Sequence, residues 1–164
     1  MPRRELESAV QLSVLDRLID EEPQHRTEAP LTRPQSLRAL KASLRRDLEW
    51  LLNTRQPLDA AEYTSKDLQG SVYDYGLPDI TSLSLRSAKD QGRLLRTIES
   101  TIALFEPRLQ GVRVSLQSTG DSTRNLHFLI EGMLRIDPAP EPIYFDTVLE
   151  TSTGEYEVKG EGSA

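Results

Sequence analysis

Residues 125–136 read Asn-Leu-His-Phe-Leu-Ile-Glu-Gly-Met-Leu-Arg-Ile, and apolar side chains recur at every second position. The even-numbered positions are apolar except Gly132, which keeps the period, whereas His127, Glu131 and Arg135 occupy odd-numbered positions. A period of two is typical of a β-strand, because successive side chains point to opposite faces of the sheet. The stretch therefore predicts a strand that buries its even-numbered side chains.

Similar patterns lie on both sides of this strand. Upstream, residues 112–116 alternate Val, Arg, Val, Ser and Leu, and Gly120-Asp121 marks a turn. Downstream, residues 143–150 predict a third strand, and Thr153-Gly154 turns the chain into a fourth at residues 155–158. Strands joined by short turns pair antiparallel. We therefore predict a small, mainly antiparallel C-terminal sheet.

The chain before this sheet has helical spacing instead. Apolar residues at intervals of three and four predict helices over residues 7–20, 36–54 and 87–105. For residues 58–85 we expect an irregular segment with a short helical turn near residues 65–70. Helices followed by strands indicate an α+β fold, with the N-terminal helices packed on one face of the sheet.

Length favours one domain, because two independent cores within 164 residues would each be small. We expect an N-terminal helix and proline-containing connection at residues 1–35, an α+β domain at residues 36–158, and a flexible tail at residues 159–164. No apolar run approaches the roughly 18 residues of a membrane span. No signal-peptide pattern follows Met1, so the expected location is the cytoplasm.

The net charge of −6 lies entirely at the C-terminal end. Residues 1–136 contain 19 acidic and 19 basic side chains, whereas residues 137–164 contain seven acidic side chains and Lys159. Residues 33–55 are locally basic. This distribution indicates contacts with proteins more than with nucleic acid, because nucleic-acid-binding domains are normally basic overall. Ordinary solvated surfaces are the simpler explanation.

Catalytic and metal-binding groups are scarce. The chain has no cysteine, which excludes disulfides, thiolate metal sites and cysteine nucleophiles, and it has two histidines. Glu106 and Glu131 are the acids best placed, beside apolar residues, to serve a glycoside hydrolase, and the sequence places no partner for either. We therefore predict no enzymatic activity, no metal site and no cofactor.

Glu106-Pro107-Arg108 lies at the junction of the last predicted helix and the first strand. The simpler interpretation is a helix end, at which proline stops the helix and arginine binds the last carbonyl groups. The alternative is a rigid acid–base corner that contacts a partner, because arginine can bind a carboxylate through two hydrogen bonds.

The acidic hairpin at residues 143–158 also has two interpretations. Negative charge can keep an exposed sheet edge from pairing with other chains. The same edge can accept a strand from a partner by β-augmentation. The residues alone favour the first interpretation.

Several segments in a fixed order resemble the TssE family of type VI secretion baseplate subunits, which are similar to a wedge protein of contractile phage-tail baseplates. These segments are Ser13–Asp20, Leu44–Arg55, Ser71–Asp79, Phe105–Leu109 and Leu126–Val158. The resemblance implies a non-enzymatic wedge protein that helps to build the baseplate on which the contractile sheath polymerises. It also implies assembly at a baseplate docked to the inner membrane.

The resemblance further implies partners and contact residues. The expected neighbours are the wedge subunits TssF and TssG, the adaptor TssK, and the sheath subunits TssB and TssC. A Glu-Pro-Arg motif in this family is associated with a contact to the neighbouring wedge core, which here falls on Glu106, Pro107 and Arg108. The C-terminal strands resemble the interlocking-strand domain of the sheath, which implies strand exchange. The residues expected to take part are Ile143, Phe145, Val148, Tyr156 and Val158.

Two other functions stay open. One is a regulatory binding protein, because an anti-adaptor of sigma-factor proteolysis has a similar fold. The other is a muramidase-like glycoside hydrolase, since phage relatives have sometimes been labelled lysozymes.

Overall fold

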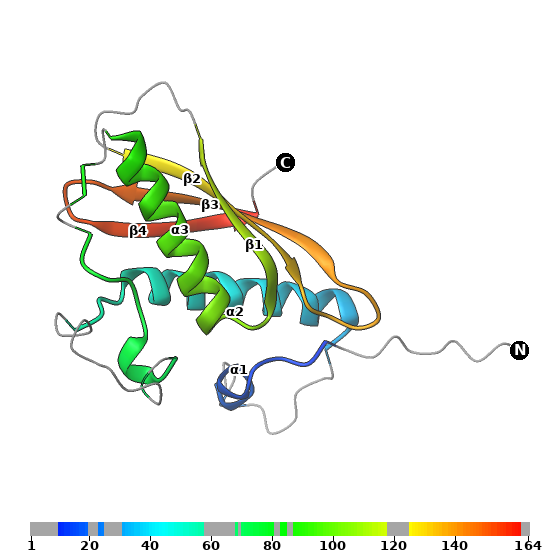
Figure 1. Cartoon of the computed structure of the whole chain (residues 1–164). Helices are drawn as coiled ribbons and strands as arrows, with labels where there is room; N and C mark the ends of the chain where they lie inside the picture. Colours follow the sequence, from blue (N-terminus) through cyan, green and yellow to red (C-terminus); the bar gives the residue numbers. More distant parts are fainter. Residues whose placement is uncertain are drawn as a thin grey trace, which may run out of the picture. The chain divides into compact units, whose positions relative to one another are not determined.

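The order of elements follows the change from helical to strand spacing along the chain (Figure 1). The computed structural model describes residues 10–19, 23–24, 31–57, 68, 70–80, 83–84, 87–117 and 125–161. Its elements are α1 (Val14–Leu18), α2 (Arg33–Asn53), the 3-10 turn η2 (Val72–Asp74), α3 (Ala88–Phe105), β1 (Leu109–Gln117), β2 (Asn125–Leu134), β3 (Glu141–Glu150) and β4 (Glu155–Glu161).

The chain divides into an N-terminal unit, residues 1–44, and a C-terminal unit, residues 45–164. Helix α2 runs through this boundary, so its first part belongs to one unit and its last part to the other. None of the helices in the described ranges combines the length and apolar character that crossing a membrane requires.

In the N-terminal unit, polar side chains fix where both helices begin. The Ser13 hydroxyl accepts a hydrogen bond from Asp16 N–H at 3.1 Å and so caps α1. Thr32 N–H donates to the Gln35 side chain at 2.9 Å, which is one half of a capping box at the start of α2.

The first helix is shorter than the prediction of residues 7–20. Within the described residues, α1 is confined to Val14–Leu18, and residues 10–12 are not helical. Ser13 has an extended backbone, and Val10 N–H donates to the Ser36 hydroxyl at 2.9 Å, so the chain upstream is bound to α2. Apolar periodicity alone could not detect this late start of the helix.

The C-terminal unit is built on a four-stranded sheet in the order β1-β2-β3-β4, in which every neighbouring pair is antiparallel. In β2, Phe128 and Ile130 are 1% and 0% exposed, while His127 and Glu131 on the other face are half-buried. The alternation that the sequence predicts is confirmed. So is the α+β fold, with helices preceding an antiparallel sheet.

Helix α3 lies across the sheet next to β1 (Figure 1). Its Leu94, Ile98 and Ile102 are at most 1% exposed. The Glu99 carboxylate accepts a hydrogen bond from Val114 N–H of β1 at 2.8 Å. An apolar stripe and one polar side chain therefore fix α3 against the sheet.

Strand β1 begins at Leu109, three residues before the predicted start. A bulge between Gln110 and Arg113 interrupts its pairing with β2. A bulge breaks the period of two on which the prediction depended. Strand β4 extends to Glu161, into the predicted tail. The predicted turn at Gly120-Asp121 lies outside the described residues.

The segment before α3 folds back on the end of α2. Leu77 N–H donates to Thr54 O at 2.8 Å, and Gln56 N–H donates to Leu77 O at 2.9 Å. Leu77 is fully buried, and Gly76 beside it has a φ of +110°. The helical turn predicted near residues 65–70 lies mostly outside the described residues, and η2 follows it.

Tyr156 on β4 gives the C-terminal unit a specific response to alkaline pH. It is 2% exposed, and burial raises its pKa from 10.0 to about 12, against the opposing charge of Arg55. Because the unfolded chain ionises this residue first, its stabilising contribution is full below about pH 10 and is lost as the pH rises towards 12. Between about pH 10 and pH 12, the unfolding free energy of the Tyr156→Phe variant should therefore fall by about 1–3 kcal/mol less than that of the parent chain. Urea titrations at each pH measure the difference.

Tyr144 on β3 supplies the control for this prediction. The Tyr144→Phe variant keeps Tyr156 and should lose stability with pH as the parent chain does. An identical alkaline loss in the Tyr156→Phe variant would contradict the assignment to Tyr156.

Candidate partner-binding site

Helix α3 ends at the corner that the sequence singles out. Glu106 is its C-cap residue, and Glu106 N–H donates to Ile102 O at 2.8 Å. The ring of Pro107 cannot continue the helix. Leu109 N–H then donates to Glu106 O at 3.1 Å and turns the chain into β1. Three residues therefore make a tight connection between helix and strand.

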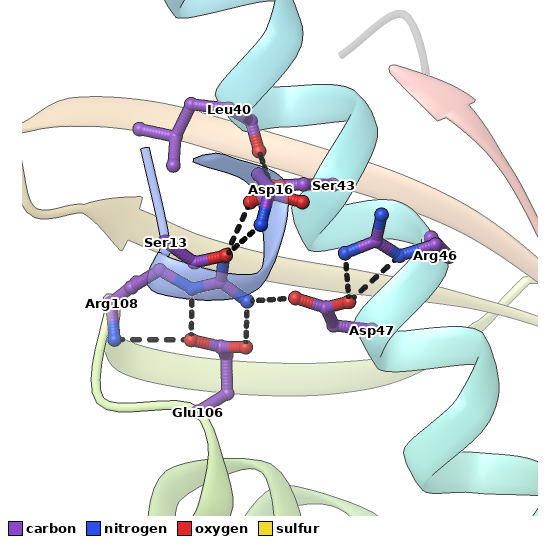
Figure 2. A network of polar contacts seen from close by, with 8 residues as sticks. All are labelled: Ser13, Asp16, Leu40, Ser43, Arg46, Asp47, Glu106 and Arg108. Carbon is purple, nitrogen blue, oxygen red and sulfur yellow. Dashed lines mark hydrogen bonds and ion pairs between the residues drawn. The ribbon is translucent and has the colours of Figure 1, made fainter. Parts of the chain in front are cut away.

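The Arg108 guanidinium binds two carboxylates at this corner (Figure 2). Its Nε donates to Glu106 Oε1 at 2.6 Å, and its Nη2 contacts Glu106 Oε2 at 2.5 Å. The same Nη2 donates to Asp47 Oδ2 of α2 at 2.6 Å. Arg46 binds the other Asp47 oxygen at 2.8 Å. The sequence predicts the Glu106–Arg108 corner but not Asp47, which is 61 residues away from Arg108 in the chain.

This charged cluster is largely removed from solvent. Glu106 is 6% exposed, and the side chains of Arg108 and Asp47 are each 23% exposed. The hydrogen bond to Glu106 raises the pKa of Arg108, so the guanidinium stays charged. Buried ion pairs with good geometry hold their side chains in one arrangement. The corner therefore has a fixed shape before any partner arrives.

Pro107 and Arg108 form a ridge between two cavities of about 340 Å³ each. The first cavity is also lined by Asp47, Leu51, Tyr75, Phe105 and Glu106, and the second by Arg135, Ile136 and Asp137. The rings of Tyr75 and Phe105 meet edge to face, with centroids 5.3 Å apart. Burial, with the nearby charges of Asp47 and Glu106, raises the pKa of Tyr75. A partner could seat side chains on either side of this ridge.

The five hairpin residues expected to contact the sheath lie inside the chain. Ile143, Phe145 and Val148 on β3 are 1%, 2% and 8% exposed. Tyr156 and Val158 on β4 are 2% and 0% exposed. Their side chains fill the core or pack against neighbouring strands. A partner strand would therefore not reach these five side chains.

Side chains of α2 already occupy the outer edge of β4. The Asn53 side chain binds both Tyr156 N–H and Tyr156 C=O, each at 2.8 Å. The Glu49 carboxylate accepts from Val158 N–H at 3.3 Å, and Arg45 donates to Val158 O at 3.2 Å. These bonds pair the outward-facing backbone groups of two alternate strand residues.

Helix and strand geometry explain why this ladder of side chains fits. Arg45, Glu49 and Asn53 lie four residues apart on one face of α2. Four helical residues rise about 6 Å, close to the roughly 6.6 Å between alternate residues of a strand. Just beyond the helix, Arg55 donates to Gly154 O at 2.8 Å. The helix thus takes the place of a fifth strand. The spacing of four is visible in the sequence, but the strand that it faces is not.

The two acids considered for glycoside hydrolysis have different surroundings. Glu106 is bound to Arg108, whereas Glu131 lies half-buried on β2, opposite Arg113 of β1 and Tyr144 of β3. Across the described ranges, no group of three or more His, Asp or Glu side chains could hold a metal ion.

Comparison with known proteins identifies the family. No curated protein matches the chain at a significant level. A family model for the baseplate wedge protein gp25 matches residues 38–139, which is more than half of the chain. The matched region includes most of α2, all of α3, β1 and β2, and the corner formed by Glu106, Pro107 and Arg108. The chain therefore belongs to the family of the baseplate wedge protein gp25, and its role is that of a structural component of a phage-tail-like baseplate.

Proposed function

We propose that this chain is a TssE-type subunit of a type VI secretion baseplate. It joins the wedge subunits to the first ring of the contractile sheath and helps to initiate sheath polymerisation. The observation that carries the proposal is the preorganised Glu106–Arg108 corner, which lies within the region matched by the family model. The chain works in the cytoplasm, at a baseplate docked to the inner membrane.

The corner is the contact to the neighbouring wedge subunits TssF and TssG, with TssK adjoining them. Arg108 is 23% exposed and its guanidinium is fixed by Glu106 and Asp47, so binding loses little side-chain entropy there. Pro107 adds a rigid apolar ring between two cavities. The sheath subunits TssB and TssC bind elsewhere, at an edge of the sheet.

The role is assembly rather than catalysis. A glycoside hydrolase needs a protonated carboxylic acid that can donate its proton to the leaving group, and a second carboxylate on the other side of the scissile bond. Glu106 instead binds an arginine through two hydrogen bonds. This engagement supports a structural use of the carboxylate.

The proposal is tested in cells of the source bacterium that lack this chain and carry a fluorescent TssB. We expect extended sheaths to disappear and to return when either the parent chain or its Glu131→Gln variant is supplied. Normal sheath assembly without the chain would contradict the proposal. Peptidoglycan turnover that Glu131→Gln abolishes would support a hydrolase, and co-purification of a response regulator without baseplate subunits would support a regulatory binding protein.

A further inference from the structure

Arg108 and Arg135 lie side by side at the corner, and their guanidinium groups are used differently. Arg135 follows the last residue of β2, and its N–H donates to Arg108 O at 2.8 Å. The Arg108 guanidinium binds two carboxylates, Glu106 and Asp47 (Figure 2). Among the residues that the structure describes, none forms a hydrogen bond or an ion pair with the exposed Arg135 side chain. Arg108 therefore shapes the corner, whereas the Arg135 guanidinium is available to a partner.

The charges around the corner also single out Arg135. The network that joins Arg46 to Glu106 contains two basic and two acidic side chains, so it has no net charge. This balance lowers the repulsion between two adjacent arginines. Asp137, which lines the same cavity as Arg135, already takes part in a polar interaction within the chain. An anion that approaches this side of the corner therefore meets one guanidinium that the network does not neutralise.

The cavity beside Arg135 fits an acidic side chain. It has a volume of about 340 Å³ and is lined by Pro107, Arg108, Arg135, Ile136 and Asp137. Pro107 and Ile136 supply apolar walls, against which the methylene groups of an aspartate or glutamate can pack. A guanidinium presents its donors in a planar fork that matches the two oxygens of one carboxylate. The cavity and the guanidinium together therefore accommodate a single carboxylate.

We propose that Arg135 binds a carboxylate of the neighbouring wedge subunit, and that this ion pair orients the chain at the corner. The inference rests on the proposed function and names the chemistry of the contact, which is an aspartate or glutamate side chain that enters the cavity between Pro107 and Ile136. Arg108 positions Arg135 through its backbone carbonyl group. The bound partner covers the ion pair, and removal of water strengthens the attraction between its charges.

Binding of the purified full chain to TssF–TssG, measured by isothermal titration calorimetry at low and high salt, tests this contact. We expect Arg135→Gln to weaken binding at least about fivefold and to make the remaining affinity less dependent on salt, because one ion pair is lost. Arg96→Gln is the same change at an exposed arginine of α3, and it should alter binding less than about twofold. Both variants should keep the urea midpoint of the parent chain.

Three results would contradict the assignment. Unchanged binding by Arg135→Gln would overturn this inference and leave the proposed function intact. Weaker binding together with a lower urea midpoint would give Arg135 a structural role and would also overturn it. No binding by the parent chain would overturn both the inference and the proposed function.

Carbodiimide coupling, which joins an amine to a carboxylate in direct contact, identifies the partner group independently. We expect the complex of the Arg135→Lys variant to give a covalent product with TssF or TssG, through an aspartate or glutamate that mass spectrometry locates. Neither the parent chain nor Arg96→Lys should give this product. Failure of the bound Arg135→Lys variant to couple, or equal coupling by Arg96→Lys, would contradict the carboxylate contact.

Discussion

Replacing Arg108 by alanine is expected to lower the free energy of unfolding by about 2–4 kcal/mol, because removing one partner of a buried ion pair leaves the other charge uncompensated. Glu106 is 6% exposed and would lose both of its hydrogen bonds to the guanidinium. Asp47 would be affected less, since Arg46 still binds it at 2.8 Å. Urea unfolding of the parent and variant chains measures the difference.

Two further variants separate the stability of the corner from its role in binding. Arg96→Ala changes an exposed arginine of α3 and should shift stability by less than about 0.5 kcal/mol. The double variant Glu106→Gln, Arg108→Gln removes both charges and should recover at least half of the loss, because no buried charge is left alone. If Arg108→Ala lowers the unfolding free energy no more than Arg96→Ala does, Arg108 does not stabilise the corner.

Replacing Gly76 by alanine is expected to destabilise the C-terminal unit by about 3–4 kcal/mol, through both backbone strain and a steric clash. Gly76 has a φ of +110°, which side chains rarely permit, and an added Cβ would lie 2.4 Å from Thr54 O. That oxygen accepts the hydrogen bond from Leu77 N–H. The clash would therefore separate two bonded segments. Thermal unfolding followed by circular dichroism measures the loss.

Gly111 is the matched control for this substitution. It also has a positive φ, +62°, but an added Cβ would meet nothing within 4 Å. Gly111→Ala should therefore lose about 1 kcal/mol, from backbone strain alone. Similar losses at the two glycines would show that the contact with Thr54 is unimportant. Because Tyr75 precedes Gly76 and packs on Phe105, Gly76→Ala should also weaken wedge binding at the corner.

The regular elements of the C-terminal unit follow from local patterns in the sequence. The strand over residues 125–136 and the helix over residues 87–105 are found within about two residues of their predicted ends, because burial on one face imposes the period directly. The late start of the first helix, after Ser13, and the bulge near Gly111 were not predictable. Each depends on one side chain or one dihedral angle.

The candidate site was predictable only in part, because its decisive contacts join distant residues. The order Glu-Pro-Arg indicates a corner, but nothing near it identifies Asp47 as the second carboxylate on Arg108. In the hairpin, the alternation of apolar residues such as Phe145 and Val158 is compatible with two roles, contact with a partner or burial in the chain's own core. The structure buries them. The side chains that close β4 lie more than 90 residues before it in the sequence. Chain topology, rather than local pattern, brings them to β4.

The contact that we propose between this chain and its wedge neighbours is the Glu106–Arg108 corner. It is tested most directly by mixing the purified chain with TssF and TssG and measuring complex formation by size-exclusion chromatography with light scattering. We predict a stable complex with the parent chain and at least tenfold weaker binding by the folded double variant Glu106→Gln, Arg108→Gln. Undiminished binding by that variant, or no complex with the parent chain, would contradict the account.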